Sequence, residues 1–305
     1  MMIKIFVIII LLAFAVFVVY VQRGQMKSAK GLEDTIVFHD LAYVTNGHER
    51  QKLDLYLPSQ GSDLPLIIWI HGGAWLTGSK DDMPILDYLA KGYAVASINY
   101  RLSSHAIFPA QIEDCKSAIR CLRANSVEYR IDPNRFGVIG ASAGGHLVAM
   151  LGTTGDVGEF DVGENLDYPS GIQAVVDLFG PTDFLQMDDH RMPDGQIHNA
   201  ADSPESLLVG GNIQDNKDKV ARANPITYVT KNASPFLIIH GDSDPLVPHH
   251  QSELLVQALQ NAKVAVELYT VKNGGHGGFG DKRVNLLMDN FFAGTLRPAK
   301  PNSNH

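Results

Sequence analysis

The sequence predicts an α/β protein with a mostly parallel central sheet, helices on both faces and a small insertion of loops as a cap. Two observations predict this class. From Leu64 onward, short apolar runs alternate with amphipathic stretches, and four of those runs end in glycine-rich motifs. In addition, 305 residues that are 45% hydrophobic and 19% charged are enough for one large core.

The predicted strands are short and apolar, as expected for a buried parallel sheet. They cover residues 66–70, 93–99, 136–139, 172–178, 235–239 and 266–271. The predicted crossover helices cover 84–91, which ends at Gly92, 110–125 and 252–261.

An antiparallel hairpin is predicted ahead of these strands, because Leu53, Leu55 and Leu57 alternate after the turn-forming pair Asn46-Gly47. The segments 152–171 and 186–219 are rich in Asp, Gly, Asn and Pro. We expect them to form loops or a cap over the carboxyl edge of the sheet.

The N-terminus differs in kind from the rest, since residues 5–21 are all apolar or aromatic and basic residues flank them. This run is longer than a secretory core of about 7 to 15 residues and at the short limit for a membrane helix. We expect residues 1–22 to be an uncleaved anchor or a signal. The orientation of this segment stays open. The basic residues after it favour a cytoplasmic catalytic domain, whereas a signal anchor would place that domain outside the membrane. Of the two, we favour export.

The remaining domain boundaries follow from this division. Residues 23–38 are predicted to be a linker and the start of the domain, residues 39–296 the catalytic domain, and residues 297–305 a polar tail. The formal net charge of −8 argues against nucleic acid as a partner. Cys115 and Cys121 lie six positions apart on a predicted helix, so they are expected to be unpaired small hydrophobes.

Ser142 is the predicted nucleophile. It lies in Gly140-Ala141-Ser142-Ala143-Gly144-Gly145, directly after a predicted strand. A reactive serine needs a sharp turn from strand to helix, and small neighbours permit that turn. The N-terminus of the following helix also favours negative charge.

His276 is the predicted base, because glycines on both sides allow its ring to reach the serine. The competing histidines have other expected roles. His249 and His250 begin a helix, where they would face solvent or cap it, and His240 ends a strand as a core residue. His71 opens a glycine loop, which it is expected to hold through hydrogen bonds.

The base needs a carboxylate to fix its tautomer, and this group should follow the strand 235–239. Asp244 is the first choice because it lies further into the loop, before Pro245. Asp242 follows the strand directly, where its alternative role is to bond to local backbone, and Asp183 is the third option.

Acyl transfer also needs amide donors where negative charge develops on the carbonyl oxygen. Ala143 supplies one predicted donor, and the loop His71-Gly72-Gly73-Ala74-Trp75 supplies others at Gly73 and Ala74. Trp75 is expected either to line the acyl site or to anchor the loop in the core.

The order Ser142, Asp244, His276 is that of α/β-hydrolases. The chain also contains Asn99-Tyr100-Arg101-Leu102, Phe108-Pro109-Ala110-Gln111 and Asp242-Ser243-Asp244-Pro245-Leu246-Val247-Pro248. Over residues 40–292 it resembles the α/β-hydrolase superfamily, within it the hormone-sensitive-lipase-like and the feruloyl/acetyl-esterase-like (BD-FAE-like) bacterial carboxylesterases. One departure is Ala74, where the lipase-type loop has a third glycine.

The resemblance implies a cofactor-free serine carboxylesterase that acts on short-chain acyl esters, including acetyl or feruloyl esters of plant polysaccharides. Two alternatives stay open. One is an amidase, peptidase or arylformamidase on the same fold, and the other is a non-catalytic binding protein that uses a hydrolase scaffold. Metal catalysis is not expected, since no His-Glu-x-x-His motif or close set of ligands is present.

Overall fold

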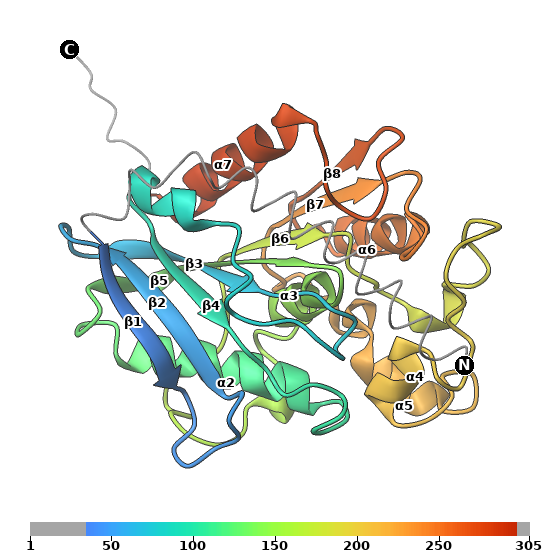
Figure 1. The fold of residues 1–305 in the computed structure, drawn as a ribbon. Coiled ribbons are helices and arrows are strands. Elements are labelled where there is room, and N and C mark those ends of the chain that lie inside the picture. Colours follow the sequence, from blue (N-terminus) through green and yellow to red (C-terminus); the bar gives the residue numbers. More distant parts are fainter. Residues whose placement is uncertain (1–34, 298–305) are drawn as a thin grey trace.

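The computed structural model describes residues 35–297, which form one eight-stranded sheet flanked by helices (Figure 1). The predicted anchor at residues 1–22, most of the linker and nearly all of the tail lie outside the described residues. Within residues 35–297, every helix is too short or too polar to cross a membrane.

The strands lie in the order β1-β2-β4-β3-β5-β6-β7-β8. β1 pairs with β2 and β2 with β4 in antiparallel fashion, and all other pairs are parallel. Their bounds are β1 (Thr35–Ala42), β2 (Lys52–Pro58), β3 (Leu64–Ile70), β4 (Ala94–Ile98), β5 (Ile131–Ala141), β6 (Ala174–Leu178), β7 (Phe236–Gly241) and β8 (Val266–Val271). The predicted fold class and the opening hairpin are confirmed.

The described residues also contain six α-helices and four short 3₁₀ helices. The α-helices are α2 (Ala110–Ala124), α3 (Ala143–Thr153), α4 (Pro204–Val209), α5 (Lys217–Ala223), α6 (His250–Asn261) and α7 (Lys282–Leu296). The 3₁₀ helices are η2 (Leu86–Lys91), η3 (Gly158–Phe160), η4 (Phe184–Gln186) and η5 (Pro225–Tyr228).

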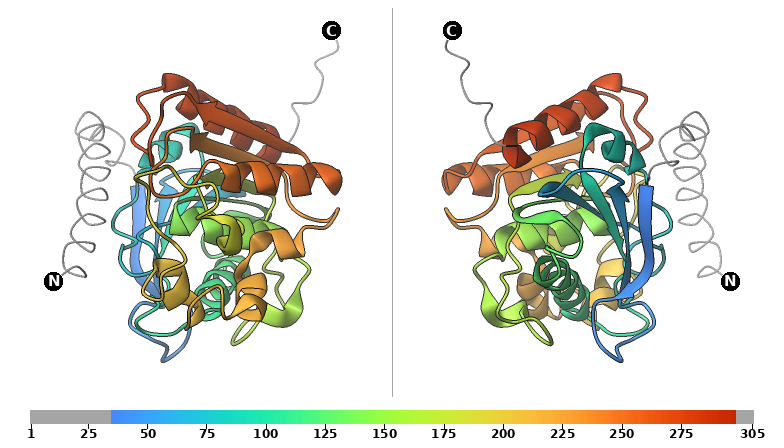
Figure 2. Two further views of the ribbon diagram at one scale, coloured as in Figure 1. Left: turned by 90° about the vertical axis from the view of Figure 1, so that its right-hand side faces the viewer. Right: turned by 90° about the vertical axis from the view of Figure 1, so that its left-hand side faces the viewer.

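Two apolar layers sandwich the sheet, because neighbouring side chains on a strand point to opposite faces. In β3, Leu66 and Ile68 face a core shared with α2, α3 and α6, whereas Ile67 and Trp69 face a core shared with η2 and α7. Figure 2 shows α7 (red) over one face of the sheet and the green helices under the other. All of β3, β4 and β7 is buried, as expected for strands covered on both faces.

Some elements differ from the prediction. The helix expected at 84–91 is the 3₁₀ helix η2, which ends as predicted at Gly92 in a left-handed conformation. The segment 186–219 is not only loop, since it contains α4 and the start of α5, which lie together beside the sheet (Figure 1). Helix α7 was not predicted. Cys115 and Cys121 are both free, as expected.

Candidate active site

Ser142 lies on a sharp turn between β5 and α3. Its backbone angles are φ 57° and ψ −119°, and its N–H donates to the carbonyl oxygen of Leu178 at 2.8 Å. A residue with a side chain rarely adopts a positive φ, and such strain clusters at functional sites. The turn leaves Ser142 half-buried, between buried Ala141 and buried Ala143.

Small residues make this turn possible, as the sequence predicted. A Cβ atom on Gly144 would lie 2.1 Å from the carbonyl oxygen of Ile70, and one on Gly140 would lie 2.3 Å from the carbonyl oxygen of Gly144. Helix α3 is thereby pressed against the end of β3, where the glycine loop begins.

The glycine loop comprises residues 71–78, and we term it the oxyanion loop after its predicted role. Three consecutive residues in it have positive φ: Gly73 at 102°, Ala74 at 55° and Trp75 at 57°. The loop lies beside the nucleophile, because a Cβ atom on Gly72 would be 3.5 Å from Cβ of Ser142. Within the described part of the chain, the N–H groups of Gly73, Ala74 and Ala143 have no acceptor, so they are free to bind an oxyanion.

His71 is fully buried at the base of the oxyanion loop. Its Nδ1 lies 2.7 Å from the carbonyl oxygen of Gly72, and its ring stacks on that of Tyr100 with centroids 4.3 Å apart. Burial lowers the pKa of His71 to about 3. The ring therefore stays neutral and holds the loop by hydrogen bonding, as expected.

His276 and Asp244 meet where the loops after β7 and β8 touch. Nδ1 of His276 lies 2.7 Å from Oδ2 of Asp244, and the His276 side chain is 16% exposed. Gly241 is required here, since a Cβ atom on it would lie 2.2 Å from the carbonyl oxygen of Gly274. The loops of the predicted acid and base are therefore in direct contact.

Every acceptor position of the Asp244 carboxylate is used. Oδ1 accepts the N–H groups of Leu246 at 2.8 Å and Val247 at 3.0 Å, and Oδ2 also lies 3.1 Å from Nε2 of His240. Burial by itself would raise the pKa of Asp244, but the charge and hydrogen bonds of His276 and His240 hold it well below its usual range. This carboxylate stays ionised beside His276.

The two competing aspartates have other partners. Asp242 accepts the N–H of Asn273 at 2.7 Å, so it binds backbone as considered, but that of the loop after β8 and not local backbone. Asp183 begins η4 and accepts the N–H of Leu185 at 3.1 Å. The structure thus brings Asp244, and neither Asp242 nor Asp183, to His276.

The structure shows no hydrogen bond between the Ser142 hydroxyl and His276. Phe179 lies near both residues. It follows Leu178, whose carbonyl oxygen accepts the Ser142 N–H, and the centroid of its ring lies 4.6 Å from that of the His276 ring. Hydrogen bonds of an active site are often long without substrate. Sequence reasoning missed Phe179, because one aromatic residue at a strand end predicts only a core position.

His249 and His250 begin α6 as predicted, but their side chains are half-buried and do not simply face solvent. His249 is at the start of α6 but makes no cap, and its side chain is only 17% exposed, with Nε2 2.9 Å from the hydroxyl of Thr270. His250 stacks on His190 with ring centroids 3.4 Å apart. Both rings have neighbours from segments distant in sequence, which local pattern cannot reveal.

Trp75 is 1% exposed and packs on His146 and Phe184. This is the position of an anchor in the core, the second of its two expected roles. Among residues 35–297, no group of three or more His, Cys, Asp or Glu side chains is placed to hold a metal ion.

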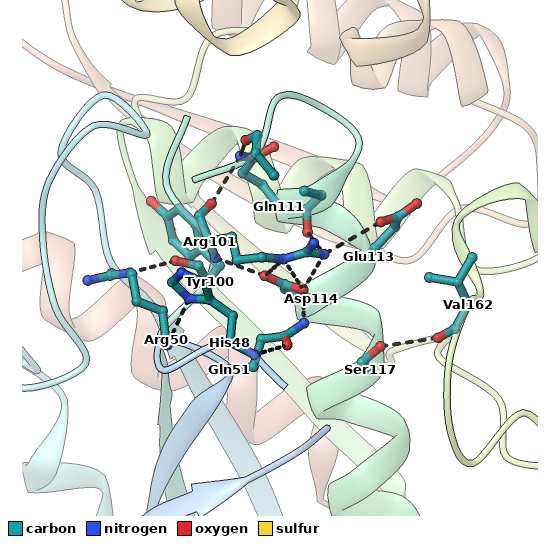
Figure 3. Close-up of polar contacts among 12 residues, drawn as sticks. His48, Arg50, Gln51, Tyr100, Arg101, Gln111, Glu113, Asp114, Ser117 and Val162 are labelled. Atoms are coloured by element: carbon teal, nitrogen blue, oxygen red, sulfur yellow. Dashed lines mark hydrogen bonds and ion pairs between the residues drawn. The ribbon is translucent and has the colours of Figure 1, made fainter. Parts of the chain in front are cut away.

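A buried polar network lies next to the oxyanion loop, around the segment that follows β4. Asp114, 1% exposed, accepts the N–H of Arg101 at 2.8 Å, the Arg101 guanidinium and the side-chain amide of Gln51 at 2.7 Å (Figure 3). Two residues further on, the N–H of Ser103 donates to the carbonyl oxygen of Trp75 at 2.8 Å. The segment 101–103 therefore connects this network to the loop.

Comparison with known proteins identifies the family of this chain. The model of the BD-FAE family matches residues 53–259. Esterase LipC of Mycobacterium tuberculosis is 33% identical over 70% of this chain and 53% of its own length, and esterase LipQ of the same organism is 30% identical over 79% and 56%. The chain spans about half the length of these curated relatives.

Solved structures show the same fold. A truncated carbohydrate esterase from gut microbiota is 37% identical, with a TM-score of 0.78 over 86% of this chain and 97% of that one. Esterase B from Lactobacillus rhamnosis is 20% identical, with a TM-score of 0.74 over 96% of each chain, a likeness of fold. With the family model matching most of its length, this chain belongs to the BD-FAE family and has the α/β-hydrolase fold.

Proposed function

We propose that this protein is a carboxylic ester hydrolase in which Ser142 is the nucleophile, His276 the base and Asp244 the acid that orients it. The observation that carries the proposal is the strained turn of Ser142 beside a loop of unpaired amides. The contact of 2.7 Å between His276 and the ionised Asp244 supports it, as do the relatives that are named as esterases.

In the proposed mechanism, Ser142 Oγ attacks the ester carbonyl while its proton passes to Nε2 of His276. Asp244 stays ionised, accepts a hydrogen bond from the Nδ1–H of His276 and stabilises the imidazolium. The N–H groups of Gly73, Ala74 and Ala143 bind the oxygen that becomes negative. The C–O bond to the alcohol then breaks, the alcohol takes the proton from His276, and water hydrolyses the acyl-serine by the same path.

We propose short-chain acyl esters as substrates, with acetyl esters of carbohydrates first among them. Ala74 adds a methyl group to the loop where the lipase-type sequence has a third glycine, and we infer that this favours a small acyl group. Two structural neighbours support a carbohydrate ester: the gut carbohydrate esterase and an acetyl ester-xyloside bifunctional hydrolase from Caldicellulosiruptor lactoaceticus, 27% identical with a TM-score of 0.65.

Hydrolysis by the purified full chain and by Ser142→Ala tests this proposal. The substrates are p-nitrophenyl acetate, p-nitrophenyl octanoate, methyl ferulate, acetylated xylan and an acyl anilide. We expect the acetyl esters to be cleaved fastest and all turnover to be lost in Ser142→Ala. Cleavage of the anilide alone would favour the amidase alternative, and a folded protein without any turnover would favour the binding protein.

The location of the enzyme is a separate proposal. We propose that residues 1–22 attach the enzyme to a membrane. This proposal rests on the apolar run of the sequence alone. Fractionation of cells that express the full chain should place it in the membrane pellet, and deletion of residues 1–22 should release it. Recovery of the full chain in the soluble fraction would contradict the anchor.

A further inference from the structure

Arg50 lies in the connection between β1 and β2, yet its guanidinium reaches the back of the oxyanion loop. Its Nε donates to the carbonyl oxygen of Tyr100 at 2.8 Å, as Figure 3 shows. Its Nη2 lies 2.9 Å from the carbonyl oxygen of Gly78 and 3.1 Å from Nε2 of His71. A single cation thus contacts both ends of the loop.

These contacts decide which nitrogen of His71 carries the proton. A guanidinium offers only donors, so Nε2 of His71 must accept from Arg50, and the proton must be on Nδ1. Nδ1 lies 2.7 Å from the carbonyl oxygen of Gly72, where a donor is needed. The opposite tautomer would place an N–H against the guanidinium and a lone pair against the carbonyl oxygen.

The bond from His71 in turn orients the peptide unit between Gly72 and Gly73. In a trans peptide the C=O and the N–H point in opposite directions, so holding the Gly72 oxygen directs the Gly73 N–H to the other side. Glycine on both sides leaves this unit free to rotate unless something holds it. Gly78 packs directly against the His71 ring, since a Cβ atom on Gly78 would lie 2.4 Å from Nδ1 of His71.

We propose that Arg50 is a positioning residue for catalysis: it holds His71 in the tautomer that directs the N–H of Gly73 toward the substrate carbonyl. This role rests on the proposed function, because it requires the oxyanion loop to bind the reacting oxygen. Arg50 acts through His71 and touches neither the substrate nor Ser142.

The first test measures the tautomer in the wild-type full chain. Long-range ¹H–¹⁵N correlation spectra of the histidine rings report which nitrogen is protonated, and the spectrum of His71→Asn assigns the signal. We expect a protonated Nδ1 and a bare Nε2 in His71. A proton on Nε2 would overturn the proposal without any variant of Arg50.

The second test compares Arg50→Met with Arg123→Met. The Arg123 guanidinium also donates to backbone carbonyls, those of Pro133, Pro169 and Gly171, away from the loop. With p-nitrophenyl acetate, we expect Arg50→Met to lower kcat about ten- to a hundredfold and change KM less than about threefold. A trifluoromethyl ketone, which forms a tetrahedral adduct, should lose affinity by the same factor.

Controls separate this role from general structural damage and from the proposed function. Arg123→Met should keep kcat near the wild-type value, and Arg50→Lys, which keeps one donor and the charge, should recover part of it. Wild-type protein without turnover that depends on Ser142 would refute the proposed function. Active wild type together with an Arg50→Met kcat equal to that of Arg123→Met would refute only the role of Arg50. If Arg50→Met does not fold, Arg50→Lys and the wild-type tautomer decide.

Discussion

On one side of Ser142, the oxyanion loop offers backbone amides, and behind them lie the neutral ring of His71 and the cation of Arg50. On the other side, the ring of His276 is backed by the buried, ionised carboxylate of Asp244. The first side is therefore suited to an oxygen that becomes negative, and the second to an imidazole that becomes positive.

The difference teaches how the two sides should respond to pH. Burial keeps the pKa of His71 at about 3, so the oxyanion side keeps one protonation state over the working range. In the proposed mechanism, the base side works by proton transfer and depends on the charge of Asp244. Damage to the oxyanion side should therefore lower the rate equally at every pH, whereas damage to the base side should change the pH profile.

The largest effect is expected from Asp244→Asn. The neutral amide lacks the charge that stabilises the imidazolium and does not hold the Nδ1–H tautomer of His276. We therefore expect kcat to fall about 10⁴-fold and its pH profile to change. The matched control is Asp242→Asn, because exposed Asp242 lies in the same loop and binds only nearby groups. Steady-state kinetics from pH 5 to 9 check this, and an equal loss in both variants would contradict the assignment of Asp244.

The next effect concerns the contact between the helix that follows Ser142 and the strand that leads into the oxyanion loop. Gly144→Ala places a methyl group 2.1 Å from the carbonyl oxygen of Ile70, so α3 and β3 must separate. We expect the free energy of unfolding to fall by about 3 kcal/mol, with loss of activity. Urea denaturation measures the first quantity, and wild-type stability would show that the nucleophile turn is not held by β3.

His71→Phe keeps an aromatic ring on Tyr100 but removes the donor to Gly72. We expect kcat to fall about a hundredfold at every pH, because one oxyanion donor loses its orientation. His71→Asn places an amide donor near the position of Nδ1 and should recover part of the rate. A changed pH profile in His71→Phe would break the comparison, since it would give His71 a part in proton transfer.

Asp177 offers a contrast with Asp244, because it is a buried carboxyl group without a ring as partner. Its Oδ1 accepts the N–H of Gly180 at 2.9 Å, whereas Oδ2 has no partner among the described residues. Burial raises the pKa of Asp177 to about 6, although the Gly180 N–H and His240 oppose the shift. The folded state therefore holds this proton more tightly than the unfolded chain does.

It follows that the contribution of Asp177 to stability should be lost as the pH rises from about 4 to about 6 and should change little above that. Asp177→Asn removes the dependence, so its gain in free energy of unfolding should be up to about 3 kcal/mol larger at pH 8 than at pH 4. Urea denaturation at both pH values measures it. An equal effect at both would show that folding does not raise the pKa of Asp177.

The smallest effect is expected far from the site. Gly294 lies exposed in α7, and a Cβ atom there would meet nothing within 4 Å. Gly294→Ala should therefore raise the free energy of unfolding by about 0.5–1 kcal/mol and leave kcat unchanged. Destabilisation would show that the clash distances used for Gly144 do not predict stability in this chain.

Several features of the fold could be predicted because their causes are local. β8 was predicted with its observed bounds, and β3, β4 and β7 to within about two residues at either end, since runs of apolar residues between turns are typical of buried strands. Helix α7 escaped prediction, because only Val284, Phe292 and Leu296 of its 15 residues are buried. The helix in 204–209 was hidden by its length of six residues within a polar segment.

The candidate site divides in the same way. Ser142, His276 and the oxyanion loop could be identified from motifs, since glycine and alanine at fixed spacing are required wherever backbone approaches backbone closely. The choice among Asp242, Asp244 and Asp183 needed the structure, as each follows a strand and could turn toward the base. The local sequence around Arg50 and Phe179 does not indicate a role for either residue, because their partners lie in segments distant in sequence.

The sequence by itself determined the alternation of strands and helices, the positions of the tight turns and the residue types able to carry out acyl transfer. These properties depend on side-chain size, polarity and backbone freedom within a few neighbouring residues. Only the tertiary structure decided which carboxylate meets His276, which tautomer His71 adopts and which cation lies behind the oxyanion loop. Such contacts form when strands from separate parts of the chain end at one edge of the sheet, and no local pattern encodes the distances between them.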